Sequence, residues 1–292
     1  MNQMHTDDRN LQAAGILAAM PADARARIAS LETLDTIDST NSELLRRTTP
    51  QHGCAILFAD AQSDGRGRHG RAWASPPGSN LYVSFARLFQ GDFSRIGGLS
   101  LAVGVAATDA MHAIGADGIG LKWPNDLVLR RRNDPDAPLR KLGGVLVECG
   151  MQAGTVRTVI GVGLNVRMSV DAAAGIDQPW IDLHTILGDR MPARALIAAG
   201  LAAAIVAALD RFEAEGLRPF RGRYAALDAL YGREINAGVA GAVRSGIANG
   251  IDADGALRLR TAQGEVVLQA GEVGVRSNDR AEIAHATPLT SR

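Results

Sequence analysis

Apolar and polar positions along the first 230 residues follow patterns typical of both helices and strands. Residues 10–30 are rich in alanine and predict helix, with a break at Pro21. Thr40 and Glu43 precede an apolar pair and match a capping box, which predicts a helix beginning at Thr40. Further helices are predicted over residues 94–114, from Pro192 to Gly216, and over residues 221–230. Strands are predicted over residues 55–60, 80–86, 127–129, 142–149 and 155–166.

These elements do not alternate regularly, and several predicted strands lie close enough in the chain to form hairpins. This favours a mixed or antiparallel sheet with helices packed on it, which is an α+β domain. The connector 130–140 is charged and contains two prolines, so we expect a solvated loop with its arginine triplet at the surface.

The pattern changes from Gly232 onwards. Short segments of Val, Ile and Leu alternate with turn signals, of which Asn249-Gly250 and Asp254-Gly255 are the clearest. This is typical of a small β-barrel. We therefore predict a boundary near residue 231. The predicted divisions are an N-terminal helical extension (1–34), a main domain (35–231), a C-terminal domain (232–278) and a tail (279–292).

Composition changes this picture little, but it excludes some classes of protein. The chain of 292 residues is 46% hydrophobic and has a net charge of zero, so no global attraction to nucleic acid is expected. Cys54 and Cys149 are too few for a disulfide framework and lie in apolar runs, which predicts buried thiols. No signal peptide is evident, and the longest uncharged apolar run, residues 195–209, is short for a membrane span. We expect a cytoplasmic protein.

The segment from Gln62 to Trp73 carries the strongest chemical signal. Within it, three glycines and three arginines alternate between Gly65 and Arg71. Glycine lets the backbone approach a ligand closely, and arginine matches carboxylate and phosphate oxygens, so we expect a loop that wraps a small anion. The spacing also fits a dinucleotide fingerprint, but Pro76 and Pro77 prevent the helix that this fingerprint requires. The alternative is a flexible basic surface loop.

Lysine is rare in this chain. Only Lys122 and Lys141 occur among 31 basic residues, and both lie beside glycine or Trp-Pro motifs. A compact ammonium can follow moving charge in a way that a rigid guanidinium cannot, which favours a functional role. The alternative is that arginine-rich coding left two lysines by chance.

Several kinds of enzyme are excluded by missing motifs. The chain has no P-loop, no nucleophile elbow and no pair of histidines at metal-binding spacing. The remaining features suit a protein that positions an anionic substrate and a nucleotide. Catalysis would then come from alignment and charge stabilisation, with no covalent intermediate on the enzyme.

Five motifs occur in the order found in biotin protein ligases, and the chain resembles that family over residues 35 to about 276. They are Asp38-Ser-Thr-Asn41, Gly65-Arg-Gly-Arg-His-Gly-Arg71, Lys122-Trp-Pro-Asn-Asp126, Lys141-Leu-Gly-Gly-Val-Leu-Val-Glu148 and Gly161-Val-Gly-Leu-Asn165. The resemblance implies a catalytic domain related to class II aminoacyl-tRNA synthetases, followed by an SH3-like β-barrel. The connector 130–140 looks longer than the usual hairpin of the family.

The resemblance also implies a reaction. Biotin would attack ATP-Mg²⁺ to give biotinyl-5′-AMP, and a lysine of the biotin carboxyl carrier protein of acetyl-CoA carboxylase would take the biotinyl group. Lipoate ligation is the alternative among enzymes. A biotin-sensing, DNA-binding repressor is the alternative from another class, but about 35 residues before the main domain are too few for a winged helix-turn-helix. We therefore expect a short form without specific DNA binding; a homodimer is compatible with all these features.

The site residues that the resemblance implies fall into three sets, with no metal site formed by protein side chains. The catalytic set is Arg66, Arg68, Lys141 and Asp126. The biotin-binding set is Ser39, Thr40, Gln62, Gly65, Arg66, Arg68, Lys141, Gly143 and Gly144. The nucleotide-binding set is Arg68, Arg71, Trp73, Asn125, Asn165 and Trp180. Capping alone would explain Thr40, and core packing would equally explain Trp73 or Trp180. Trp123, which precedes a proline, is expected to pack under its loop.

Overall fold

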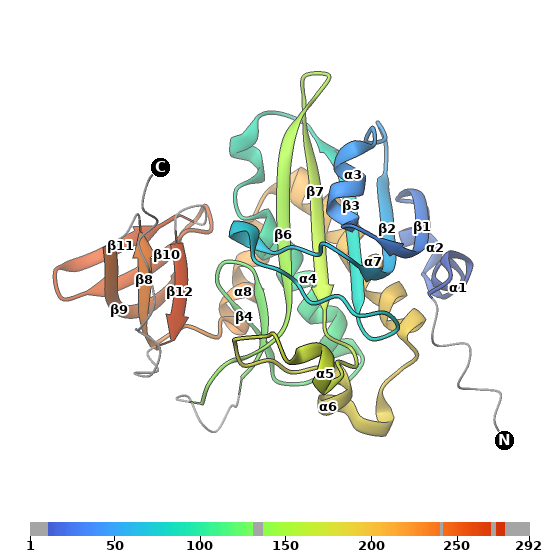
Figure 1. Cartoon of the computed structure of the whole chain (residues 1–292). Helices are drawn as coiled ribbons and strands as arrows, with labels where there is room; N and C mark the ends of the chain where they lie inside the picture. Colours follow the sequence, from blue (N-terminus) through green and yellow to red (C-terminus); the bar gives the residue numbers. More distant parts are fainter. Residues whose placement is uncertain (1–10, 131–136, 240–241, 270–272, 278–292) are drawn as a thin grey trace, which may run out of the picture.

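The computed structural model describes residues 11–130, 137–239, 242–269 and 273–277, and its largest element is a seven-stranded sheet (Figure 1). The strand order is β1-β2-β3-β7-β6-β5-β4; β1 and β2 are parallel, and every other neighbouring pair is antiparallel. The strands are β1 (Ile28–Ile37), β2 (Cys54–Gln62), β3 (Leu81–Phe89), β4 (Ile119–Lys122), β5 (Asp126–Leu129), β6 (Arg140–Gln152) and β7 (Thr155–Leu164). The predicted mixed sheet with helices is confirmed.

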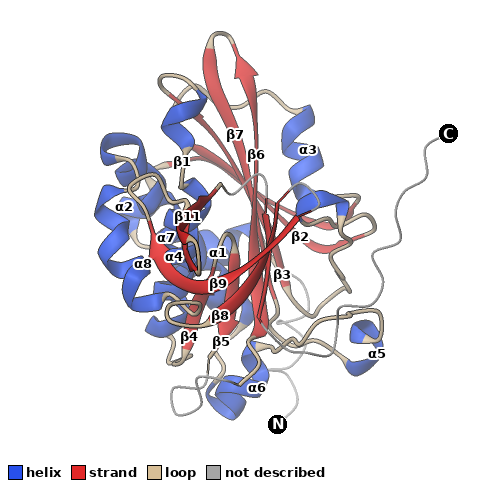
Figure 2. Ribbon diagram, turned by 90° about the vertical axis from the view of Figure 1, so that its left-hand side faces the viewer, coloured by secondary structure: helices blue, strands red, loops and turns tan. Residues whose placement is uncertain are grey.

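Helices cover the two faces of this sheet unequally. Figure 2 shows α4 (Leu99–Ala113) and α7 (Arg194–Glu215) on one side of β6 and β7, and α3 (Thr40–Arg46) on the other. The remaining helices are α1 (Ala13–Ala19), α2 (Ala22–Arg25), α5 (Val170–Ala173), α6 (Leu183–Leu187) and α8 (Arg221–Leu227).

The large hydrophobic core lies on the side of α4 and α7. Alternate residues of β3 and β7, such as Val83, Phe85 and Ile160, are buried in it. Because successive residues of a strand point to opposite faces, their neighbours Ser84 and Gly161 face the other side. α3 partly covers that second face, where Leu44 packs with Leu57, Ala86 and Val159 in a small apolar cluster. Beside this cluster, around Ser84 and Gly161, the face is polar and rich in glycine.

Two helical segments of the described chain are long and apolar enough to cross a membrane, Phe93–Ala113 and Arg194–Glu215. In each, 56% of the apolar window is buried inside the fold, where α4 and α7 contact each other and the sheet. We interpret both as core helices. The apolar run over residues 195–209 lies within α7.

The C-terminal part forms a separate antiparallel sheet of five strands. Their order is β11-β10-β9-β8-β12. The strands are β8 (Glu234–Val239), β9 (Ala242–Ile251), β10 (Leu257–Thr261), β11 (Gly264–Leu268) and β12 (Val273–Ser277). The predicted all-β character is confirmed, although the pairing among the described residues leaves the sheet open. The predicted domain limits stay predictions.

One turn of the small sheet contacts the large domain closely. The Trp123 indole is buried and its Nε1 donates a hydrogen bond to the Gly255 carbonyl at 2.9 Å. Gly255 has φ +87°, and a Cβ there would lie 2.9 Å from Leu101 and 3.0 Å from Leu217. Only glycine suits both the conformation and the space. Trp123 is thus a packing residue, as predicted for a Trp before Pro in a buried turn.

The predicted beginning of a helix at Thr40 is confirmed, although the residue that caps α3 is Ser39, whose side chain accepts from Ser42 N. Two other local predictions are wrong. Residues 28–30 belong to the edge strand β1 and not to a helix, because pairing with β2 outweighs the alanine-rich helical signal that precedes them. Cys149 is exposed, because β6 there extends into a projecting hairpin with β7.

Other elements agree in type but differ in extent. The short strand β4 (Ile119–Lys122) has no counterpart in the prediction, and α8 ends at Leu227 instead of residue 230. The predicted break at Pro21 is confirmed, because it separates α1 from α2. Of the connector 130–140, residues 131–136 lie outside the described residues.

Candidate active site

The candidate site lies on the polar face of the large sheet, where two glycines of β7 leave space above the strand. A Cβ on Gly161 would lie 2.4 Å from Asn41 Oδ1, and a Cβ on Gly163 would lie 2.5 Å from the Trp73 ring. Real Cβ atoms do not approach other atoms so closely. The Gly-Val-Gly motif therefore lets Asn41 and Trp73 lie directly on the backbone of β7.

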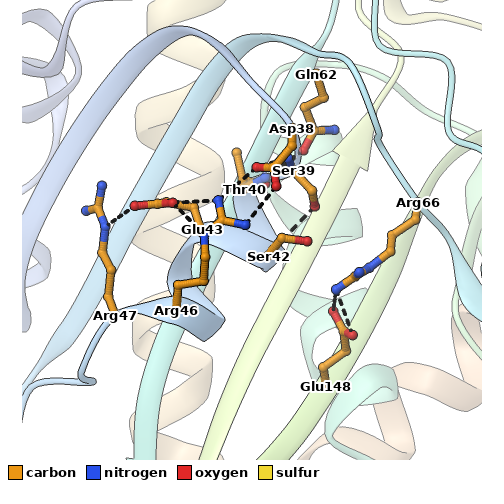
Figure 3. Close-up of polar contacts among 10 residues, drawn as sticks. All are labelled: Asp38, Ser39, Thr40, Ser42, Glu43, Arg46, Arg47, Gln62, Arg66 and Glu148. Carbon is orange, nitrogen blue, oxygen red and sulfur yellow. Dashed lines mark hydrogen bonds and ion pairs between the residues drawn. The ribbon is translucent and has the colours of Figure 1, made fainter.

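The beginning of α3 is joined to the end of β2 through Gln62 (Figure 3). Thr40 N donates to Gln62 Oε1 at 2.9 Å, and Thr40 Oγ1 lies 3.2 Å from the same oxygen. Gln62 Nε2 donates to Ser75 Oγ at 3.0 Å. These contacts fix the orientation of the amide, with its oxygen toward α3 and its nitrogen toward the loop that follows β2. A ligand bound here would therefore meet the Gln62 amide in one fixed orientation.

The glycine- and arginine-rich segment forms a narrow hairpin of residues 65–73, which we call the Gly-Arg hairpin. Trp73 N donates to the Gly65 carbonyl at 2.8 Å, and Gly67 N donates to the Arg71 carbonyl at 2.7 Å. Its tip is a 3₁₀ turn over Arg68–Gly70. In Figure 1 the chain that follows β2 crosses in front of β6 and β7, so the hairpin lies over the polar face.

The three arginines of the Gly-Arg hairpin have different surroundings. Arg66 Nη2 lies 3.0 Å and 3.1 Å from the two carboxylate oxygens of Glu148 (Figure 3). Burial lowers the pKa of Arg68, while the charge of Asp126 opposes that shift. Arg71 is exposed. Arg68 is therefore the hairpin arginine that interacts electrostatically with Asp126.

Lys141 is held at the centre of the site. Its Nζ lies 2.8 Å from Asp126 Oδ1 and 5.2 Å from the centroid of the Trp73 ring. A Cβ on Gly144 would lie 3.5 Å from the same nitrogen. Both charged side chains are 17% exposed, and the backbone of Lys141 forms a bridge with Trp180. This is a mostly desolvated ammonium in a fixed position.

The two asparagines predicted to lie near a nucleotide brace the backbone around Lys141. Asn125 Nδ2 donates to the Val145 carbonyl at 2.8 Å. Asn165 is buried, and its Nδ2 lies 3.1 Å from the Ile181 carbonyl and 3.4 Å from that of Lys141. Their amide nitrogens thus hold neighbouring strands and loops in place.

The predicted residues accordingly form two adjoining groups. One surrounds Gln62 and comprises Ser39, Thr40, Gln62 and Gly65. The other surrounds Lys141 and comprises Trp73, Asp126, Lys141 and Gly144. Gly143 pairs with Leu164 in the ladder between β6 and β7 and adjoins the second group. Lys122 is the cross-strand neighbour of Asp126.

Four polar residues of this region are absent from the sequence-based sets: Asn41, Ser75, Ser84 and Glu148. Asn41 and Glu148 end two of the motifs, which was a usable signal. Ser75 and Ser84 are isolated in sequence and carried none. Ser84 Oγ lies 2.7 Å from Thr40 Oγ1 and also contacts Asn41. It therefore supports the start of α3 from below.

Cationic groups around a single carboxylate suit the binding of anions. Lys141 and Arg68 supply positive charge near Asp126, and the Trp73 indole N–H is buried without an acceptor among the described residues. No group of three or more His, Cys, Asp or Glu side chains that could hold a metal ion occurs in the described part of the chain. The site can neutralise and align negatively charged reactants.

Known proteins match the chain over most of its length. The model of the biotin/lipoate A/B protein ligase family matches residues 33–165, and that of the biotin protein ligase C-terminal domain matches residues 231–276. The bifunctional ligase/repressor BirA of Escherichia coli is 38% identical over 253 residues, which cover 86% of this chain and 75% of that protein. A biotin–[acetyl-CoA-carboxylase] ligase of Paracoccus denitrificans is 32% identical, over 81% of this chain and 96% of that protein.

A solved structure shows the same architecture. The biotin protein ligase from Aquifex aeolicus in complex with biotin and ATP superposes with a TM-score of 0.70 at 25% identity. The match covers 86% of this chain and all of that one.

Proposed function

The chain belongs to the biotin/lipoate A/B protein ligase family, and from this premise we propose how its residues activate biotin and transfer it to a carrier protein. It is a biotin protein ligase, which forms biotinyl-5′-AMP from biotin and ATP and passes the biotinyl group to a lysine. The roles that we assign to individual residues rest on one observation, the fixed position of the Lys141 ammonium between Asp126 and the Trp73 ring.

In the first step a carboxylate oxygen of biotin attacks the α-phosphorus of ATP. A new P–O bond forms, the bond to the β-phosphate oxygen breaks, and pyrophosphate leaves. Charge moves across the α-phosphate oxygens, and we assign its neutralisation to Lys141 and Arg68. Lys141 is already placed by Asp126 and Trp73, so little reorganisation is needed as the charge moves.

The ureido end of biotin would lie at the group around Gln62. Gln62 offers an amide whose orientation is set by Thr40 and Ser75. We assign Ser39, Thr40 and Gln62 to the ureido group, with the backbone of Gly143 and Gly144 lining the pocket. The valerate chain of biotin would then run from this group to Lys141.

The nucleotide would lie on the side of the Gly-Arg hairpin. The buried Trp73 N–H has no acceptor among the described residues, which supports a ligand oxygen or nitrogen in that position. We assign Trp73 and Trp180 to the neighbourhood of the adenine, Arg68 and Arg71 to the phosphates, and Asn125 and Asn165 to the walls of the nucleotide site.

In the second step the amine of a carrier lysine attacks the acyl carbon of biotinyl-5′-AMP, and AMP leaves with the electrons of the C–O bond. We assign Asp126, the carboxylate paired with Lys141, to orient the amine, and the proton that the amine loses on forming the amide passes to solvent. Mg²⁺ would arrive on the triphosphate, because Asp126 alone is no protein cage for a metal, and it would supply charge neutralisation when bound. We propose the biotin carboxyl carrier protein of acetyl-CoA carboxylase as the carrier.

The test is biotin-dependent exchange of labelled pyrophosphate into ATP in the absence of any carrier. We expect exchange with biotin and none with lipoate. Exchange with lipoate alone would favour the other branch of the family. Addition of the carrier domain should then release AMP in a biotin-dependent manner.

The proposal extends to the cellular setting. We propose a cytoplasmic enzyme, compatible with a homodimer, that does not bind DNA specifically. The described N-terminal helices α1 and α2 have only seven and four residues, and Ile16 of α1 is buried against the main domain. A gel-shift with biotin-gene promoter DNA at physiological salt should show no sequence-dependent complex.

A further inference from the structure

Glu148 of β6 joins two walls of the site that are far apart in sequence. One carboxylate oxygen accepts from Asn41 Nδ2 at 2.8 Å, and both lie within 3.1 Å of Arg66 Nη2 (Figure 3). Asn41 belongs to α3 and Arg66 to the Gly-Arg hairpin. A single side chain on the sheet thus contacts the helix on one side and the hairpin on the other.

Arg66 begins the first arm of the Gly-Arg hairpin, next to its base. The base is tied to β2, because Gly65 lies against Ser75 and Gln62, where a Cβ would come within 2.9 Å of both. The tip, by contrast, includes the exposed residues His69 and Gly70. The contact with Glu148 therefore restrains the arm of the hairpin that connects its fixed base with its exposed tip.

We propose that Glu148 is a positioning residue, which latches the Gly-Arg hairpin to the sheet and to α3 and so retains biotinyl-5′-AMP in the closed site. Arg66 then acts through Glu148, whereas Arg68 acts on the ligand. This inference rests on the proposed function and reassigns Arg66 from the catalytic set to the latch. The two side chains are 34% and 29% exposed, so the contact is only partly screened by solvent.

The test is a double-mutant cycle of Glu148→Gln and Arg66→Gln. Each change keeps a polar side chain but removes one charge. We expect either variant to release biotinyl-5′-AMP about fivefold faster or more, and the double variant to add little to that, because both remove the same contact. Single-turnover formation of the adenylate by Glu148→Gln should stay within about twofold of the wild-type rate.

Hydrogen exchange of the amides of residues 65–73 supplies a readout that needs no activity. The exchange should accelerate in both variants. A second variant, Asn41→Asp, places a like charge beside Glu148 and should loosen the latch from the helix side. The matched control is Glu265→Gln, which removes an exposed carboxylate paired with Arg258 on the small sheet and should change neither readout.

Three outcomes would overturn the proposal. The first is that the two changes accelerate release independently, so that their effects multiply in the double variant. The second is that Glu148→Gln changes neither the release of biotinyl-5′-AMP nor the hydrogen exchange. The third is a loss of about a hundredfold in adenylate formation confined to the Arg66 variant, which would place Arg66 on the reacting atoms. Failure of the proposed function is separate, because it would show as absent biotinyl-5′-AMP with the wild-type protein.

Discussion

At the scale of single residues, Lys141 sits in a space shaped for an ammonium. Replacement by arginine keeps the charge but adds a rigid fork beside Asp126, the Trp73 ring and Gly144. We expect Lys141→Arg to slow adenylate formation by about 10²-fold or more, the scale seen for loss of one charge-stabilising donor. Biotin affinity should fall less, because the ureido end is held by the group around Gln62.

The measurements are single-turnover formation of biotinyl-5′-AMP and calorimetry with biotin. Arg218→Lys is the control, because that side chain is 78% exposed and has no role in the proposed site. Adenylate formation by Lys141→Arg at the wild-type rate would remove the catalytic role, and the scarcity of lysine would then reflect coding alone.

The same scale shows why one glycine of β7 is needed. A Cβ at Gly163 would lie 2.5 Å from the Trp73 ring, so Gly163→Ala must displace the indole or the strand. We expect a loss of about 1–3 kcal/mol in the free energy of unfolding, the usual cost of overpacking, and a raised KM for ATP. Gly150→Ala is the matched control, because nothing lies within 4 Å of its Cβ position on β6. Equal thermal unfolding and KM values for both variants would contradict this explanation.

At the scale of elements, the Gly-Arg hairpin combines a tied base with an exposed tip. His69 and Gly70 adopt positive φ angles of 57° and 72°, and both are exposed. We expect trypsin to cleave after Arg68 or Arg71 in the absence of ligands and to be slowed by biotin with ATP, because ligand phosphates would engage the same arginines. Peptide mapping over time measures this. Identical cleavage rates with and without ligands would exclude the hairpin as a clamp.

At the scale of the whole molecule, Asp228 lies in the segment that joins α8 to β8, between the two sheets. Burial raises the pKa of this carboxyl from 3.8 to about 6, although its Oδ1 accepts from Leu230 N at 2.8 Å. A raised folded-state pKa means that the folded protein binds the proton more tightly than the unfolded chain. The stabilisation is therefore complete below about pH 4 and is lost as the pH rises through 6.

The variant Asp228→Asn should remove this dependence. Between pH 4 and 7 the wild type should lose up to about 3 kcal/mol of unfolding free energy through this group, a loss that the variant lacks. Urea unfolding at several pH values measures the difference. Parallel pH profiles for the two proteins would show that Asp228 titrates normally in the fold.

The amino-acid sequence by itself determined the chemistry of this protein. Glycines at Gly161 and Gly163, the two rare lysines and the arginine-rich hairpin identify the family and its reaction, because each needs a particular residue type at a particular place in the chain. The all-β character of the C-terminal part could also be predicted from the sequence, since its turns contain glycines such as Gly255. Signals of this kind depend only on residue type and short spacing along the chain, so the sequence alone contains them.

Only the tertiary structure decided which groups meet. Arg66 and Glu148 are 82 positions apart, and with 31 acidic residues in the chain no spacing singles out that pair. Thr40 satisfies a capping pattern, yet Ser39 caps α3 and Thr40 contacts Gln62, because the packing of α3 on the sheet turns it toward the end of β2. The register of the sheet sets these distances, and the register depends on pairing between strands that are remote in sequence.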